Sequence, residues 1–176
     1  IGDNPFMVME YVDGMSLQSL VAKIGPLSPL RVANYLRQSA SGLEHAHQKG
    51  LIHRDIKPGN ILLGRDGVVK LLDLGLARFS RDESQNDGIT KQFDANSIIG
   101  TIDFMAPEQA DVTQQSDIRS DIYALGCTCY YLLSGRLPFN GTVTQKLYGH
   151  KMLAPEPLSM RVDNLPIRLL EVIERM

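Results

Sequence analysis

The 176-residue sequence has no tryptophan, two cysteines and few aromatic residues, and neither sign of charge predominates. Its 18 Lys and Arg residues nearly balance its 20 Asp and Glu residues, for a formal net charge of −2. A protein that binds nucleic acid through phosphate contacts would be more basic. No apolar run reaches the roughly 18 residues of a membrane-spanning helix. The composition therefore excludes an electrostatic nucleic-acid binder and predicts no membrane segment in this chain.

The two cysteines, Cys127 and Cys129, are two positions apart. On a helix their side chains point in different directions, so they cannot form a disulfide with each other. Such sparse and unpaired cysteines fit a reducing compartment. We expect a cytoplasmic location for this part, and membrane anchoring of the parent protein elsewhere in its sequence stays open. An apolar content of 43% with 22% charged residues is typical of a folded globular domain.

The two ends of the sequence predict a piece of a longer protein. The chain begins at Ile1 without a start methionine or a signal peptide, and it stops at Met176 inside a helical pattern.

Most of the chain has the periodicity of helices, with capping residues at their ends. Helices are expected at Ser16–Lys23, Ser28–Lys49, Asp117–Ser134, Thr142–Met152 and Pro166–Met176. In the second of these, one stripe at spacings of three and four is expected to face the core: Leu30, Ala33, Leu36, Ala40 and Leu43.

A few short runs are expected to be strands, at Phe6–Glu10, Leu51–His53, Ile61–Leu63 and Val68–Leu72. The last two flank Arg65-Asp66-Gly67, which is a hairpin signal. The fold class predicted from this order is α+β and mostly helical. The stretch 79–97 is polar and aperiodic, which is typical of a functional or disordered loop.

The most informative segment is His53–Asn60, with the sequence HRDIKPGN, between two expected strands. Asp73 follows a further strand within the triplet Asp-Leu-Gly. These segments match two protein-kinase signatures, H-R-D-x-x-x-x-N and D-F-G. In phosphoryl transfer, Asp55 would orient and deprotonate the acceptor hydroxyl, and Lys57 would supply positive charge near the phosphate. Asn60 and Asp73 offer the oxygen ligands that Mg²⁺ prefers.

Two further motifs follow in the same order, Gly100-Thr101 and Ala106-Pro107-Glu108. Each motif alone has a structural interpretation, such as an ordinary loop aspartate or a turn residue. Their shared order and spacing favour a kinase, and the chain resembles the C-terminal lobe of a eukaryotic-like, bacterial-type Ser/Thr protein kinase. The resemblance implies a protein-kinase-like fold. It assigns residues 1–12 to the last strand of the N-terminal lobe and the hinge, and 13–176 to a C-terminal lobe truncated at its end.

The resemblance also implies roles for particular residues. The hinge residues Glu10 and Val12, the ribose-proximal Ser16 and the adenine floor Leu62 would bind ATP, together with Lys57, Asn60 and Asp73. The hydroxyl of Thr101 would bridge Asp55 and Lys57. Structural roles fall to the packed His53, to Leu74 in place of the usual Phe, and to Glu108 and Asp121, the last of which would hold the backbone of the loop.

Regulation by phosphorylation is implied by Arg54, which directly precedes Asp55. Family members with this arginine are commonly activated by a phosphate in the loop before the Gly-Thr motif. We expect Ser97 to carry it, with Thr90 as a rival site.

The function implied is transfer of the ATP γ-phosphoryl group, with Mg²⁺, to Ser or Thr hydroxyls of a protein substrate. Lys57-Pro58 and Thr101 favour Ser/Thr over Tyr, and dual specificity stays open. The Gly-rich loop and the strand lysine of the N-terminal lobe are absent, so we expect this piece alone to be inactive and to need that missing lobe. The alternatives are a non-catalytic pseudokinase or docking module, and a small-molecule phosphotransferase.

Overall fold

The structure is a computed structural model that describes residues 8–72, 100–110 and 116–176. The expectations for Asp73, Leu74, Thr90 and Ser97 lie outside these residues. Within them, the elements in chain order are β1 (Gly14–Ser16), α1 (Leu17–Ile24), α2 (Pro29–Gln48), the 3-10 helix η1 (Pro58–Asn60), β2 (Ile61–Gly64), β3 (Val69–Leu71), the 3-10 helix η2 (Pro107–Ala110), α5 (Ile118–Ser134), α6 (Val143–Met152), the 3-10 helix η3 (Leu158–Met160) and α7 (Ile167–Glu174).

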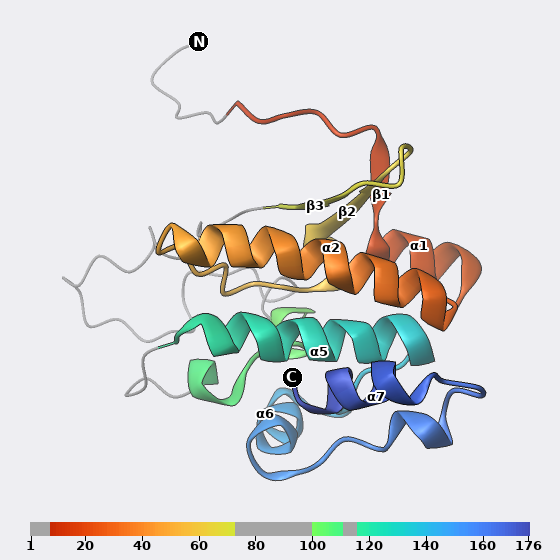
Figure 1. The fold of residues 1–176 in the computed structure, drawn as a ribbon. Coiled ribbons are helices and arrows are strands. Elements are labelled where there is room, and N and C mark those ends of the chain that lie inside the picture. Colours follow the sequence, from red (N-terminus) through yellow and green to blue (C-terminus); the bar gives the residue numbers. More distant parts are fainter. Residues whose placement is uncertain (1–7, 73–99, 111–115) are drawn as a thin grey trace, which may run out of the picture.

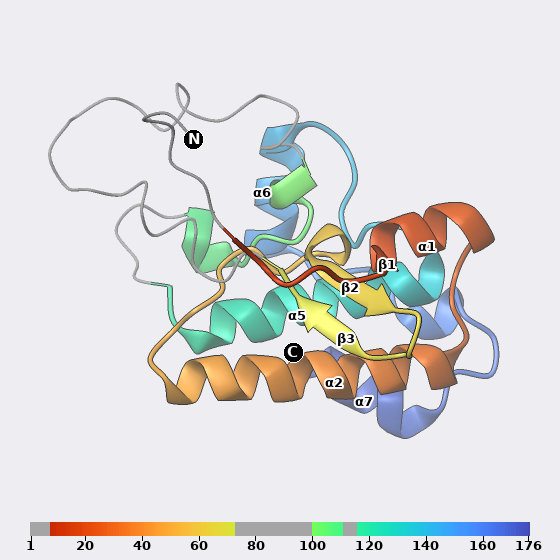
Figure 2. The ribbon, with the colours of Figure 1, turned by 90° about the horizontal axis from the view of Figure 1, so that it is seen from above.

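The elements form layers around two long helices, α2 and α5, which lie side by side (Figures 1 and 2). The small sheet covers α2 through β3, and α7 packs on the other side of α5. Helix α6 packs against η2, and α1 packs against η1. The mostly helical α+β fold expected from the sequence is confirmed.

The sheet is antiparallel with β2 in the middle. Gly14 of β1 pairs with Gly64 of β2, and Ile61 of β2 pairs with Leu71 of β3. The turn between β2 and β3 includes Gly67, whose φ of 79° is the left-handed conformation that glycine adopts most readily. The hairpin is therefore where the sequence predicted it. Because β2 directly follows η1, the sheet anchors the segment that carries the HRDIKPGN motif.

The strand expected at Leu51–His53 is wrong, and of the strand expected at Phe6–Glu10 the described part is not a strand. Residues 8–10 and Leu51–His53 have no strand structure. A strand needs a neighbour for its backbone groups, whereas the backbone N–H of His53 donates to the side chain of Asp121. The first strand lies instead at Gly14–Ser16, where β2 provides a partner.

Helix α2 has the expected bounds but a different buried face. Leu30 is 82% exposed and Ala40 is exposed as well. Leu30 is two residues from the fully buried Val32, and hence nearly opposite it on a helix with 3.6 residues per turn. The face that packs inward consists of Val32, Tyr35, Leu36, Ser39, Leu43 and Ala46. The expected stripe was wrong for its first and fourth members.

The remaining helices agree with the sequence prediction. Asp117 caps α5 by accepting a hydrogen bond from the backbone N–H of Arg119, and Gly135 ends the helix with a φ of 68°. Cys127 and Cys129 are buried in α5 as free thiols, and burial raises the pKa of each to about 12. These thiols stay protonated at neutral pH and pack as apolar side chains. In the described part of the chain, no helix has the length and apolar character required to cross a membrane.

Candidate active site

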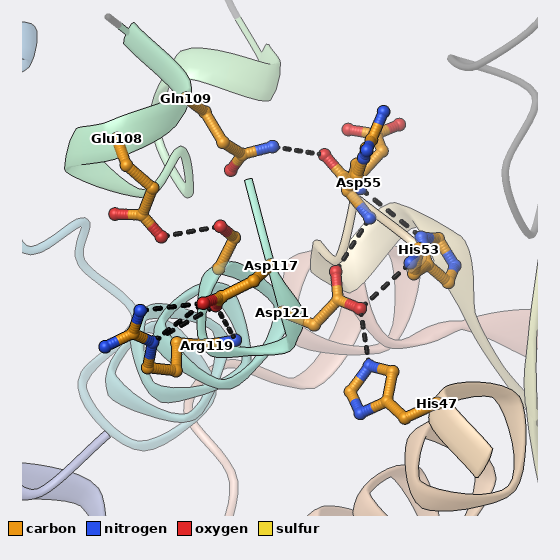
Figure 3. A network of polar contacts seen from close by, with 10 residues as sticks. His47, His53, Asp55, Glu108, Gln109, Asp117, Arg119 and Asp121 are labelled. Carbon is orange, nitrogen blue, oxygen red and sulfur yellow. Dashed lines mark hydrogen bonds and ion pairs between the residues drawn. The ribbon is translucent and has the colours of Figure 1, made fainter. Parts of the chain in front are cut away.

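The loop before Asp55 is held by one buried carboxylate. Asp121, in the first turn of α5, is fully buried. Its Oδ1 accepts the backbone N–H of Arg54 at 2.7 Å, and its Oδ2 accepts that of His53 at 2.9 Å. The Nε2 atom of His47, on α2, lies 2.8 Å from the same Oδ2 (Figure 3). The catalytic-loop candidate is thus attached to both long helices of the core.

These bonds fix an unusual backbone conformation at Arg54. Its φ is 66°, in the left-handed region that costs a residue with a Cβ atom roughly 1–2 kcal/mol. The hydrogen bonds from His53 and Arg54 to the buried carboxylate offset this cost, because they satisfy both backbone donors inside the protein.

His53 also stabilises this loop, through a hydrogen bond that its buried side chain accepts. Its side chain is completely buried, and its Nδ1 accepts the backbone N–H of Asp55 at 3.3 Å. A ring nitrogen that accepts a hydrogen bond carries no proton, so the geometry makes Nδ1 an acceptor. His53 therefore packs and orients the loop, and its ring is not exposed to a substrate.

The carboxylate of Asp55 is the meeting point of three polar side chains. Asn60 Nδ2 donates to Asp55 Oδ2 at 2.8 Å and to the Asp55 carbonyl at 2.9 Å. Lys57 Nζ lies 2.9 Å from Asp55 Oδ2, and Thr101 Oγ1 donates to Asp55 Oδ1 at 3.2 Å. The Asp55 side chain is still 29% exposed, so it is ordered and accessible at the same time.

Lys57 and Thr101 complete a triangle with Asp55. Lys57 Nζ donates to Thr101 Oγ1 at 2.8 Å, although the two residues are 44 positions apart. A carboxylate beside a fixed ammonium group can hold a hydroxyl nucleophile, accept its proton and balance charge on a transferring group. The arrangement therefore has the parts needed for transfer of an anionic group to a hydroxyl.

Asn60 also fits the role of a metal ligand. Both of its hydrogen bonds to Asp55 use the amide nitrogen. They leave the amide oxygen to act as a hard ligand of the kind that Mg²⁺ prefers. Asp73, the second ligand expected from the sequence, lies outside the described residues.

The expected nucleotide residues have partners of their own. The carboxylate of Glu10 pairs with Lys70 of β3 at 2.7 Å, so a hinge role would fall to the Glu10 backbone. The hydroxyl of Ser16 caps α1 by accepting the backbone N–H of Ser19 at 3.1 Å. Val12 and Leu62 are half-buried, the latter in β2.

Glu108 joins η2 to α5. Its Oε1 accepts a hydrogen bond from the hydroxyl of Ser120 at 2.5 Å (Figure 3). At the start of α5, the side chain of Arg119 binds Asp117, and this hydrogen bond lowers the pKa of that carboxyl. The N-terminal end of α5 is therefore linked to the Ala-Pro-Glu segment as well as to the catalytic-loop candidate.

Sequence reasoning missed Gln109, which bridges two parts of the site. Its Nε2 donates to the carbonyl of Arg54 at 2.8 Å, and its Oε1 accepts the backbone N–H of Ala106 at 3.0 Å. It also missed His47, Asp103 and Lys146. These residues contact partners that are far away in the sequence, and no local sequence pattern predicts such contacts.

The comparisons agree with this geometry. A family model described as protein kinase domain matches residues 2–171. The chain belongs to the protein kinase domain family, whose members generally use ATP and a divalent metal ion.

Among its relatives is a protein named serine/threonine-protein kinase PknB from Mycobacterium tuberculosis, 38% identical over 173 residues. A protein of the same name from Mycobacterium leprae is 36% identical over 173 residues. The match covers 98% of this chain and 27% of each of these relatives. A probable serine/threonine-protein kinase PknB from Bifidobacterium longum is 37% identical over 163 residues, which are 92% of this chain and 23% of that protein. The chain thus spans about a quarter of the length of these curated relatives. Its resemblance to bacterial-type Ser/Thr kinases is confirmed.

Proposed function

We propose that this chain carries the catalytic loop of a protein kinase that transfers the γ-phosphoryl group of ATP to Ser or Thr hydroxyls of protein substrates. The observation that carries the proposal is the Asp55 carboxylate, ordered by Asn60, Lys57 and Thr101 and still accessible. Pseudokinases usually lose the catalytic aspartate or a metal ligand, and here Asp55 and Asn60 are both present. This favours the enzyme over a docking module.

In the proposed reaction, Asp55 accepts a hydrogen bond from the substrate hydroxyl, aligns its oxygen with the γ-phosphorus and takes the proton. The new bond joins the substrate oxygen to phosphorus as the bond to the β-γ bridging oxygen breaks. The ammonium group of Lys57 lies beside the same carboxylate and stabilises negative charge on the transferring group. Thr101 fixes the mutual position of the two side chains.

The proposed cofactors are ATP and Mg²⁺. Asn60 would hold the metal through its amide oxygen, and Asp73 would be its carboxylate partner. When bound, Mg²⁺ neutralises charge on the phosphate oxygens. The backbone of Glu10 and Val12, with Leu62 and Ser16, would contact the nucleoside. We further propose that residues 1–12 carry the hinge, that 13–176 are the C-terminal lobe, and that this part acts in the cytoplasm.

We also propose that phosphorylation regulates the site through Arg54. The Nε atom of its guanidinium is buried and has no hydrogen-bond partner among the residues that the structure describes. A phosphate adds about −1.5 to −2 charge and forms strong hydrogen bonds with arginine. Ser97 is the proposed acceptor and Thr90 the rival. Full activity of Ser97→Ala in the full-length protein, with no phosphate at Ser97 by mass spectrometry, would exclude Ser97.

The direct test of the function uses the full-length protein with ATP, Mg²⁺ and matched peptides that differ only in a Ser, Thr or Tyr acceptor. We expect phosphate on the Ser and Thr peptides, and its loss when the metal is chelated. Incorporation into the Tyr peptide alone would contradict the Ser/Thr assignment. Nucleotide binding without transfer to any peptide would favour the pseudokinase.

A further inference from the structure

The segment from Gly100 to Met105, whose residues 100–102 are helical, brings Thr101 to Asp55. Its turn contains two long hydrogen bonds, from Phe104 N to the Thr101 carbonyl at 3.2 Å and from Met105 N to the Ile102 carbonyl at 3.3 Å. Ile102 and Phe104 are buried, and Phe104 packs edge-to-face on Tyr131 of α5. The buried side chains of Ile102 and Phe104 thus help to hold the segment against the core.

Asp103, in the middle of this segment, forms an ion pair with Lys146 of α6. Both side chains are withdrawn from water: Asp103 is 13% exposed and Lys146 is 12% exposed. A charge at this depth is costly unless it is paired, and removal of one partner leaves the other buried and uncompensated. The position of the Lys146 ammonium group therefore dictates where the Asp103 carboxylate can lie.

Helix α6 presents this lysine from a fixed position. Thr142 and Gln145 form a reciprocal capping box at its N-terminal end. His150, one turn after Lys146 and on the same face, hydrogen-bonds Tyr123 of α5 at 2.7 Å. The capping box fixes where the helix begins, and the bond to Tyr123 attaches the turn after Lys146 to α5, so the ammonium group projects from an ordered helix.

The ion pair lies two residues from the catalytic-loop contact of Thr101. The hydrogen bond from Thr101 Oγ1 to Asp55 Oδ1 is 3.2 Å long, which is beyond the usual 2.5–3.0 Å for such bonds. A shift of the segment by a few tenths of an ångström would break it. The ion pair at Asp103 is therefore one of the contacts on which the position of Thr101 relative to Asp55 depends.

We infer that Lys146 is a positioning residue for phosphoryl transfer: through Asp103 it holds the segment Gly100–Met105 so that the Thr101 hydroxyl orders Asp55 and Lys57. This inference rests on the proposed kinase function. It makes α6, which contributes no side chain to the triangle at Asp55, a determinant of the chemical step.

The test compares variants of the full-length protein by steady-state kinetics and by hydrogen exchange of residues 100–106. Lys146→Met should lower kcat about tenfold or more, because small misplacements of catalytic groups are costly. It should leave the KM for ATP within about twofold, since the nucleotide contacts are elsewhere. Lys146→Arg should restore most of kcat, and exchange in 100–106 should rise in the Met variant alone. Lys23→Met, an exposed lysine at the end of α1, is the matched control and should behave as wild type.

A second variant separates positioning from stability. Lys146→Met with Asp103→Leu removes both charges, so it should recover thermal stability. The inference predicts that its kcat stays low. Recovery of full kcat in this double variant, or an unchanged kcat in Lys146→Met, would overturn it. A wild-type protein without any phosphotransfer would instead contradict the proposed function, and the exchange of 100–106 would then decide whether Lys146 holds the segment.

Discussion

The backbone N–H of Arg54 donates a 2.7 Å hydrogen bond to Oδ1 of Asp121, 67 positions further along the chain. This bond holds Arg54 in a left-handed conformation and ties the catalytic-loop candidate to the buried start of α5. The shape of the loop is therefore a property of the helical core, and changes in that core should reach Asp55.

Replacing Asp121 by Ala should destabilise the protein and lower its turnover. The backbone donors of His53 and Arg54 and the ring of His47 would lose their acceptor inside the core. We expect a loss of about 3 kcal/mol or more in the free energy of unfolding. Denaturant unfolding measures it, with the exposed Asp163→Ala as the control. An Asp121→Ala protein as stable as the control would show that the loop does not depend on this carboxylate.

Thr101→Val should lower kcat about tenfold or more while preserving the fold. Valine keeps the shape of the side chain but cannot donate to Asp55 or accept from Lys57. Thr101→Ser keeps the hydroxyl and should retain most of the activity. Equal kcat values for the Val and Ser variants, measured with the full-length protein, would exclude a role for the hydroxyl.

Gln109→Ala should cost about 1–3 kcal/mol of stability, because the Ala106 N–H and the Arg54 carbonyl both lose their partner. The matched control is Gln48→Ala, an exposed glutamine at the end of α2. Thermal and denaturant unfolding give the comparison. If the two alanine variants are equally stable, the bridge contributes nothing to the fold.

His150 should make stability depend on pH in the weakly acidic range. Burial lowers its pKa below 6.5, against the opposing effect of the Asp103 carboxylate. The unfolded chain then binds the proton more readily, so the contribution is complete above about pH 6.5 and is lost as the pH falls toward the lowered pKa. Between pH 7 and 5, wild type should lose more stability than His150→Gln, which does not titrate. Parallel stability curves for the two proteins would contradict this.

Local signals in the sequence were enough to predict the helices and the hairpin. Gly67 and Gly135 have positive φ values at the positions where the turn and the helix end were expected. The strand expected at Leu51–His53 failed for a non-local reason, since Asp121 takes the backbone donor of His53. The buried face of α2 was misplaced at Leu30 because apolar spacing alone does not show which side of a helix meets the core.

The candidate site also contains residues that the sequence predicted and residues that it did not. Asp55, Lys57 and Asn60 lie within one short motif, so the sequence predicted that they act together. Gln109 contacts the Arg54 carbonyl from η2, and Lys146 contacts Asp103 from α6, both only through tertiary packing. Their contacts depend on how the helices pack against each other, and the amino-acid sequence of one chain contains no local signal for that packing.

The most direct test of the central claim is the turnover of Asp55→Asn in the full-length protein. Asparagine keeps the shape of the side chain but cannot take the proton of the substrate hydroxyl. We expect kcat to fall by orders of magnitude, while the dissociation constant for ATP with Mg²⁺ and the stability stay close to those of wild type and of the control Asp163→Asn. Near-normal turnover of Asp55→Asn would contradict the account of this site.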